Sequence, residues 1–312
     1  MMDYNAIKNQ YKSRARLDAL ASNLSLTTKS LREKRMAVQS AHDAELDKAR
    51  AEAAREAVLS SLVYASRIQR ALLPPRTIFT EAFADFSILW HPRDIVSGDI
   101  YWIKNFADGT VLCVCDCTGH GTPGALLTML VVSAFDVIVN EHTYKDTASI
   151  MRKLDAHLAA ALYDSSDEEK NDMADIRDGC DLAILYFPKS GDVTFSSANF
   201  PVFVCDGSAV TRLKGQRIFV GEGKLSGDVK IKTTVIPSKP GNKYYISSDG
   251  MFDQKGGAKG LPFGYSSFKK IILEHHNEPL DVISGKIWDK YESYRGSHPR
   301  KDDFELISIK PQ

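Results

Sequence analysis

Residues 116–124 read DCTGHGTPG, directly after the apolar run TVLCVC and directly before the helix-like run ALLTMLVVSAFDVIV. Gly119, Gly121 and Gly124 have the G-x-G-x-x-G spacing of a dinucleotide-binding turn between a strand and a helix. Asp116, however, stands at the end of the strand, where a pyrophosphate would meet a bare negative charge. The stretch is therefore either a phosphate cradle or a turn that serves a metal ion.

The order of elements after this turn argues against the dinucleotide fold, which needs a strand, a helix and then a parallel strand carrying an acidic residue. Here the helix expected at 123–140 is followed by a second helix at 147–163 and by a polar stretch at 164–178, which we expect to be a loop. Short β-rich runs then succeed one another, many joined by hairpin-like turns such as PKSGD and CDGSA. Runs of strands with segregated helices predict an α+β fold with antiparallel sheets.

The predicted strands are FSILW at 86, DIYWI at 99, TVLCVC at 110, LAILYF at 182, DVTFSS at 192, PVFVC at 201, VKIKTTVI at 229, KYYIS at 243 and FELISI at 304. Two further helices are expected at 266–275 and 279–293. GEGKLSG at 221–227 is a second glycine-rich stretch, which we interpret as a surface loop.

Composition restricts the class of protein. A chain of 312 residues that is 43% hydrophobic can bury a substantial core. Its 40 basic and 40 acidic residues cancel, so no overall field favours nucleic acid. We expect no membrane span and a soluble, cytoplasmic protein. The five cysteines do not suggest a disulfide framework, and Cys113, Cys115 and Cys117 alternate along one strand as small buried residues would.

The first 73 residues have the composition of one long helix. Between Asp3 and Leu73 there is no glycine or proline. Apolar residues on coiled-coil spacing are Leu17, Leu20, Leu24, Leu31 and Val38, and a second stripe follows at Val58, Leu62, Ala65 and Leu72. Thr27, Lys34 and Glu45 interrupt the seam. We predict a helical segment over 1–73 that forms a homodimer, followed at Pro74 by a second domain over 74–312.

Aspartates recur at the ends of the predicted strands. Asp99 follows a glycine and opens one strand, Asp116 closes the next, Asp249 closes KYYISS, and Asp302 with Asp303 precedes the last. Clustered carboxylates repel one another unless cations neutralise them. Oxygen ligands without histidine pairs suit Mg²⁺ or Mn²⁺ better than zinc, and two such ions activate a shared water for attack on a phosphoryl group.

Seven ordered motifs resemble bacterial SpoIIE/RsbU-type phosphatases of the metal-dependent protein phosphatase 2C superfamily. They span about 67 to 310 and read RIQRALLPP (67–75), HPRDIVSGDIYW (91–102), DCTGHGTPGALLTML (116–130), DGCDLAILYF (178–187), SSANFPVFV (196–204), SSDGMFDQKGG (247–257) and KDDFELISIK (301–310). The resemblance implies an αββα sandwich, in which helices flank two antiparallel sheets. It also implies a serine/threonine protein phosphatase with two Mn²⁺ or Mg²⁺ ions.

The resemblance also assigns residues. It implies metal ligation by Asp99, Asp116, Asp249, Asp302 and the backbone carbonyl of Cys117, with Asp303 as the alternate to Asp302. His120 falls on the histidine proposed as the general acid, for which an imidazole is suited because its pKa lies near neutrality. Arg93 and Asn199 are candidate contacts to the phosphoprotein. The implied substrate is a phosphorylated STAS-domain protein, an antagonist of an anti-sigma factor, and the implied control runs through the N-terminal coiled coil.

Two other classes of protein remain open. One is a non-catalytic adaptor whose phosphatase-like domain only binds a phosphoprotein, and the intact aspartate set argues against it. The other is a two-metal nucleotide cyclase, which the hairpin-rich order and the GHG turn disfavour. Binding of NAD is the least favoured alternative, after the phosphatase, the adaptor and the cyclase.

Overall fold

The computed structural model describes residues 4–163, 178–227 and 229–312. The chain divides into two compact units, Met1–Ser61 and Leu62–Gln312. The polar loop expected at 164–178 lies outside the described residues, except for Asp178. Within the described part of the chain, no helix has the length and apolar character needed to cross a membrane.

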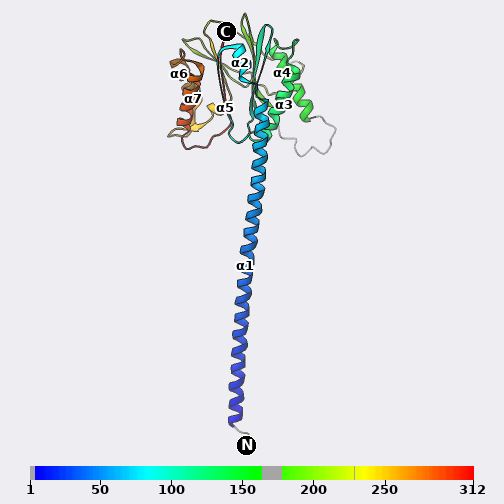
Figure 1. Cartoon of the computed structure of the whole chain (residues 1–312), viewed down its shortest axis with the longest axis vertical. Helices are drawn as coiled ribbons and strands as arrows, with labels where there is room; N and C mark the ends of the chain where they lie inside the picture. Colours follow the sequence, from blue (N-terminus) through cyan, green and yellow to red (C-terminus); the bar gives the residue numbers. More distant parts are fainter. Residues whose placement is uncertain (1–3, 164–177, 228) are drawn as a thin grey trace. The chain divides into compact units, whose positions relative to one another are not determined.

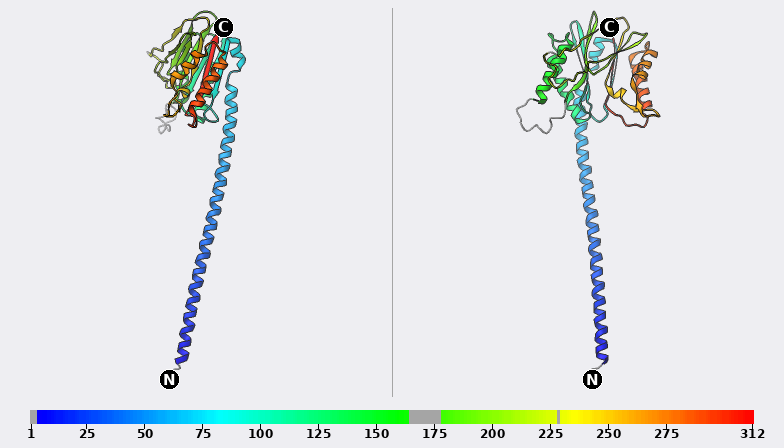
Figure 2. Two further views of the ribbon diagram at one scale, coloured as in Figure 1. Left: turned by 90° about the vertical axis from the view of Figure 1, so that its left-hand side faces the viewer. Right: turned by 180° about the vertical axis from the view of Figure 1, so that it is seen from behind.

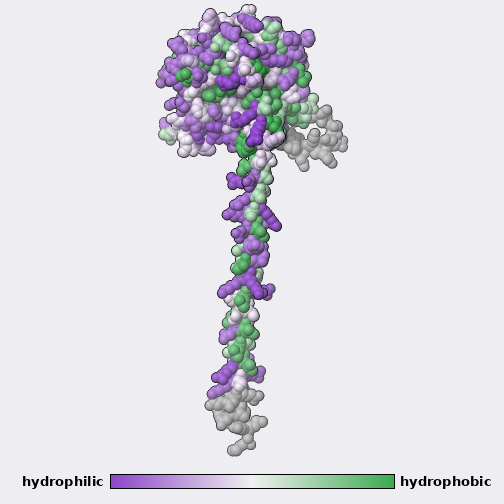
Figure 3. Space-filling view, viewed as in Figure 1, coloured by the Kyte–Doolittle hydropathy of each residue, from purple (hydrophilic) through white to green (hydrophobic). Residues whose placement is uncertain are grey.

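Helix α1 runs from Tyr4 to Leu72 without a break, which confirms the long N-terminal helix. The predicted seam residues Leu17, Leu20, Leu24, Leu31 and Val38 are each more than half exposed in the single chain. Figure 3 shows apolar and polar side chains interleaved along this helix. The second stripe differs, because Leu62, Ala65 and Leu72 are partly buried and Leu72 packs against the core of the second unit.

The second unit is a sandwich of two five-stranded antiparallel sheets with helices outside both, as expected (Figures 1 and 2). One sheet has the order β2-β3-β4-β5-β8, formed by Asp99–Phe106, Gly109–Cys117, Cys180–Pro188, Val193–Ala198 and Thr234–Ile236. The other has the order β1-β12-β9-β6-β7, formed by Phe83–His91, Phe304–Pro311, Lys243–Ser247, Val202–Cys205 and Val210–Leu213. A short ribbon pairs β10 (Lys255–Gly256) with β11 (Leu261–Pro262).

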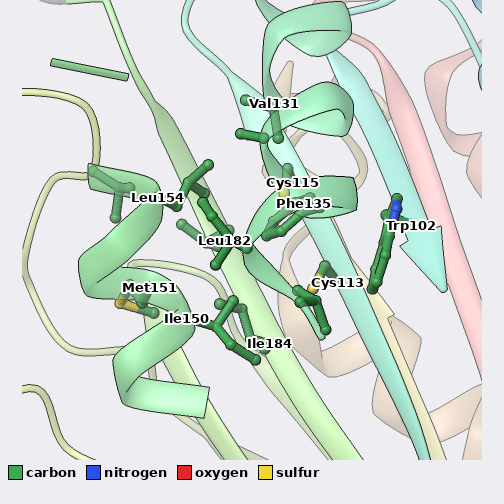
Figure 4. Packing of buried hydrophobic residues seen from close by; sticks show 14 of the residues in the cluster. Trp102, Cys113, Cys115, Val131, Phe135, Ile150, Met151, Leu154, Leu182 and Ile184 are labelled. Atoms are coloured by element: carbon green, nitrogen blue, oxygen red, sulfur yellow. The ribbon is translucent and has the colours of Figure 1, made fainter. Parts of the chain in front are cut away.

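Helices cover the outer face of each sheet. Helices α3 (Thr122–Ile138) and α4 (Thr147–Tyr163) pack on the first sheet, and Figure 4 shows Val131 and Phe135 of α3 beside the apolar side chains of β3 and β4. Helices α6 (Gly264–Glu274) and α7 (Leu280–Arg295) pack on the second sheet. A third apolar cluster fills the space between the sheets. All five cysteines are buried and free, in line with their interpretation as core residues.

Some local features differ from the sequence-based expectation. Of the run 229–236, only β8 forms a strand, because the Gln216 side chain binds the backbone of Lys230 and Lys232 instead. Strand β7 was not predicted. Helices α2 (Arg76–Ala82), just after the proline pair, and α5 (Asp249–Phe252) were not predicted either.

The glycine-rich stretch at 221–227 is a loop whose backbone N–H groups bind the carboxylate of Asp155. Asp155, on α4, is fully buried and accepts hydrogen bonds from the backbone N–H groups of Gly221, Gly223 and Leu225 at 2.8, 3.1 and 2.7 Å. Because these donors already bind an internal anion, the loop is not a free phosphate cradle.

Candidate metal centre

The carboxylates predicted at strand ends gather at one edge of the sandwich. Asp99 on β2 and Asp116 on β3 are directly paired across the first sheet. The second sheet reaches the same place, because Ser248, at the end of β9, donates its hydroxyl proton to Asp99 Oδ2 at 2.6 Å. Asp303, next to β12, accepts a hydrogen bond from the Gly98 N–H at 2.7 Å. The folding of both sheets therefore brings these four chain segments together.

Burial of these carboxylates increases from the rim inward. Asp249, at the start of α5, is exposed, and Asp116 and Asp302 are partly buried. Asp99 and Asp303 are only 2% and 3% exposed. The site is thus an open edge with a buried acidic floor. Among the described residues, no three His, Cys, Asp or Glu side chains are arranged so that they could hold a metal ion as they stand.

The electrostatics of the cluster favour a bound cation. Burial, followed by the charge of Asp116, raises the pKa of Asp99 well above its ordinary value. Burial and the charge of Asp249 do the same for the pKa of Asp116. The pKa of Asp303 is raised as well, chiefly by burial. The pKa of Asp249 is raised by partial desolvation of its carboxylate and by the charges of Asp253 and Asp302, although the residue is exposed at the rim. Each carboxylate that ionises here costs folding free energy that a divalent cation would offset, so the donor set fits such a group.

Asp302 and Asp303 have different environments. Asp303 Oδ1 accepts a hydrogen bond from the Arg93 N–H at 2.6 Å, and its Oδ2 accepts the one from Gly98. Both oxygens of Asp303 therefore fasten the loop that leads into Asp99. Within the described residues, the Asp302 carboxylate accepts a single, local hydrogen bond, from the Asp303 N–H to Oδ1 at 3.0 Å.

A second clamp on this loop comes from helix α1. Gln69, fully buried, donates from Nε2 to the Ser97 carbonyl at 2.6 Å and accepts from the Ser97 N–H at 3.0 Å. The same Nε2 donates to Thr128 Oγ1 on α3 at 2.9 Å. The end of α1 is thus hydrogen-bonded to the residue two positions before Asp99 and to the helix that follows the GHG turn.

Glycines at the site allow close backbone contacts. A Cβ at Gly98 would lie 2.5 Å from the Gly119 carbonyl oxygen, and a Cβ at Gly124 would lie 2.1 Å from it. At Gly250, a Cβ would lie 1.9 Å from the Asp303 carbonyl oxygen. The G-x-G-x-x-G spacing therefore serves chain packing beside Asp116, as an alternative to dinucleotide binding.

The remaining predicted residues lie around the edge. His120 is exposed, with Nδ1 3.3 Å from Asp94 Oδ2. The Arg93 guanidinium donates from Nη1 to the Lys301 carbonyl at 3.0 Å. Asn199, the one non-glycine residue with positive φ (56°) in the described chain, donates from Nδ2 to Asp181 Oδ1 at 2.8 Å.

Sequence reasoning missed several side chains of this region. Asp181 on β4 is the direct strand partner of Asp116, and burial raises its pKa to about 6. Glu305 on β12 is fully buried, and its charge contributes to the raised pKa of Asp99. Asp181 stands inside the motif DGCDLAILYF, where strand pairing to TVLCVC was the available signal. Asp94 and Gln69 stand in motifs too, but their contacts depend on the tertiary fold.

The fold is that of the PP2C type, a family of serine/threonine phosphatases. The family model for stage II sporulation protein E (SpoIIE) matches residues 107–312. The chain therefore belongs to the SpoIIE family, and the SpoIIE/RsbU resemblance of its motifs is confirmed.

Solved structures agree with this assignment. The SiaA-PP2C domain of Pseudomonas aeruginosa is 32% identical, with a TM-score of 0.73 over 83% of this chain and 99% of that one. The SpoIIE phosphatase domain of Bacillus subtilis, with a fragment of its regulatory domain, is 16% identical and has a TM-score of 0.58 over 73% and 63% of the chains. RsbX in complex with magnesium has 14% identity and a TM-score of 0.50 over 73% and 94%. The two latter matches show the fold alone. No curated protein matches the chain.

The close backbone contact at Gly250 leads to a prediction. Gly250→Ala should lower the free energy of unfolding by about 2–3 kcal/mol, because its Cβ would overlap the Asp303 carbonyl. Gly285→Ala is the matched control: this glycine lies in α7 with nothing within 4 Å of an added Cβ, so the change should stabilise the protein by about 0.5–1 kcal/mol. Urea denaturation measures both, and equal effects at the two sites would contradict the assigned contact.

Proposed function

We propose that this chain is a metal-dependent phosphatase that hydrolyses phosphoserine or phosphothreonine in a protein partner. The observation that carries the proposal is the convergence of strand-end carboxylates at one edge, with raised pKa values at Asp99, Asp116 and Asp249. Membership of the SpoIIE family supports the reaction type. The proposed catalytic domain is 74–312, preceded by the helical segment 1–73.

The proposed metal ligands are Asp99, Asp116, Asp249, Asp302 and the backbone carbonyl of Cys117. The chemistry of this donor set fits Mn²⁺ or Mg²⁺, and the related RsbX was solved with magnesium. When bound, two divalent cations lower the pKa of a shared water and neutralise the phosphoryl oxygens. Asp116, which lies between Asp99 on β2 and Asp181 on β4, is the residue best placed to serve both ions.

Asp302 is preferred over Asp303 as the ligand. Both oxygens of Asp303 accept backbone N–H groups, from Arg93 and Gly98, and this role holds the Asp99 loop in place. The Asp302 carboxylate is only partly buried and retains capacity for a cation. This division supports Asp302 at the metal and Asp303 in support of the loop.

We propose that His120 is the general acid that protonates the leaving serine or threonine oxygen. Its exposed position in the turn that follows Asp116 suits a group that meets a substrate arriving from solvent. Asp94, whose Oδ2 lies 3.3 Å from His120 Nδ1, would orient the ring so that its other nitrogen faces the substrate.

Substrate contacts are proposed at two residues. Arg93 donates to the Lys301 carbonyl through Nη1, so a phosphoprotein would be contacted by the other nitrogens of the guanidinium group. The Asn199 side chain donates from Nδ2 to Asp181 and to the Ile218 carbonyl, the latter at 3.0 Å, and these two bonds fix the side chain beside Asp181. The proposed partner is a phosphorylated STAS-domain protein, on the resemblance to RsbU-type phosphatases.

Control through the N-terminal helix is proposed as well. The apolar residues of α1 that are exposed in one chain would be buried in a homodimer. Gln69, on the last turns of the same helix, binds both backbone groups of Ser97. A change in the helix dimer would therefore act on the loop that carries Asp99.

The phosphatase activity should depend on a divalent metal ion. The purified chain should hydrolyse p-nitrophenyl phosphate with Mn²⁺ or Mg²⁺ and not with chelator. Asp116→Asn should lower the turnover at least about a hundredfold, because it removes the central carboxylate. A folded chain without turnover under any metal would instead favour the non-catalytic adaptor.

The general acid is tested by changing the leaving group. His120→Gln should slow hydrolysis of a phosphoserine peptide by about a hundredfold, because a serine alkoxide needs a proton to leave. The same variant should slow p-nitrophenyl phosphate hydrolysis far less, since nitrophenolate leaves without one. Equal losses for the two substrates would contradict the role of His120.

Coupling to the helix is tested by deletion of residues 1–60, which keeps Gln69. The truncated chain should be a monomer by light scattering, and its metal-dependent turnover should differ about fivefold or more from that of the full chain. Dimerisation and activity that both stay unchanged would refute control by the coiled coil.

A further inference from the structure

Glu305 is a fully buried acidic residue that the proposed reaction does not yet use. Its neighbours Phe304 and Leu306 belong to the apolar cluster beneath α6 and α7, whereas Ile307 belongs to the cluster between the sheets. Side chains alternate along a strand, so the Glu305 side chain points between the sheets, as Ile307 does. At this end of β12, the Ser248 hydroxyl accepts the Glu305 N–H and donates to the Asp99 carboxylate of the metal centre.

Neither carboxylate oxygen of Glu305 has a hydrogen-bond partner in the described part of the chain. The buried acids next to it differ in this respect, since Asp303 accepts two backbone N–H groups and Asp99 accepts the Ser248 hydroxyl. An unpaired buried carboxylate is costly, and proteins normally pair such a group or bind a metal with it.

The charges that reach Glu305 are all negative. Burial is the main cause that raises its pKa well above the ordinary value, and the charges of Asp116 and Asp303 follow. Among the described residues, no lysine or arginine contributes to this shift. The Glu305 side chain therefore requires a positive counter-charge, and the aspartates beside it require the same one.

Two backbone links fix Glu305 relative to Asp99. The Glu305 N–H donates to Ser248 Oγ at 3.1 Å, and that hydroxyl donates to Asp99 Oδ2 at 2.6 Å. Trp90, the strand partner of Glu305 on β1, donates from Nε1 to the Asp99 carbonyl at 2.9 Å. The strand cannot move away from the acidic floor without breaking these links.

We propose that Glu305 is a further carboxylate of the metal centre, which binds the ion nearest Asp99 and Asp116 from the side between the sheets, directly or through one water. The inference rests on the proposed metal-dependent function and adds a ligand that the family motifs do not assign. Its oxygens are hard donors of the kind that Mn²⁺ and Mg²⁺ prefer.

The experiment measures Mn²⁺ affinity of the full chain by isothermal titration calorimetry and by the electron paramagnetic resonance signal of free Mn²⁺. Glu305→Gln keeps the side-chain shape and removes the charge. It should weaken Mn²⁺ binding about ten- to a hundredfold. After chelation, its thermal midpoint should lie above that of the wild type, because the unpaired buried charge is gone.

Asp192→Asn is the matched control. Asp192 precedes β5, at the end of the β4–β5 hairpin remote from Asp181, and is exposed while it accepts the Ser238 N–H at 3.0 Å. The Asp192→Asn substitution removes one negative charge, as Glu305→Gln does, and should leave the Mn²⁺ affinity at the wild-type value. A loss in both variants would indicate an effect of net charge and overturn the assignment to Glu305.

The outcomes separate this inference from the proposed function. Wild-type Mn²⁺ affinity in Glu305→Gln would overturn the role of Glu305 and leave the phosphatase proposal intact. A wild-type chain that binds no Mn²⁺ would overturn both. If Glu305→Gln does not fold by circular dichroism, Glu305→Asp replaces it: the shorter carboxylate should also weaken binding, and undiminished affinity would overturn the inference.

Discussion

Mutual repulsion among buried carboxylates is the constraint on which the active edge of this protein depends. Asp99 and Asp116 face each other across β2 and β3. Burial is the main cause that raises both pKa values, followed by the charge of Asp116 at Asp99 and by the charge of Asp249 at Asp116. Such an arrangement opposes folding at neutral pH unless a cation compensates. The divalent metal binding that we propose would explain the open edge, the oxygen-only donors and the unpaired Glu305 together.

The chain holds this repulsive cluster together through its backbone. Asp303 fastens the Asp99 loop by two N–H groups, and Gln69 fastens it at Ser97 from helix α1. Close contacts at Gly98 and Gly250 bring segments from the two sheets within reach. These neutral interactions position the acids without cancelling their charge, which leaves the charge available for metal. They also connect the helix to the site, since Gln69 is part of both.

The sequence predicted those features that depend on local pattern. Strand alternation, glycine-flanked strand ends and ordered motifs led to the αββα sandwich and to Asp99, Asp116, Asp249 and Asp302 as candidates, whose ligand role is a proposal. Short or irregular elements escaped, because β7 has four residues and the backbone at 230–232 is bound by Gln216. The sequence also could not separate Asp302 from Asp303, since only the fold brings Arg93 and Gly98 to the second of them.

Glu305 shows why the rest of the site required coordinates. Within FELISI, Glu305 shares one strand face with Ile307, while Phe304 and Leu306 lie on the other face. Both faces are therefore largely apolar, and the alternation alone does not reveal that a second sheet covers the Glu305 side chain. Asp181 is a similar case, since strand register makes it the partner of Asp116.

We propose that the carboxylate edge binds two divalent ions and that Asp116 would be a ligand of both. An anomalous difference map from a crystal of the full chain grown with Mn²⁺ tests this most directly. The account predicts two peaks roughly 3.5–4 Å apart, both within ligand distance of Asp116, with Asp302 in contact and Asp303 still bound to the loop. An absence of Mn²⁺ at this edge, or peaks only at other surfaces, would contradict it.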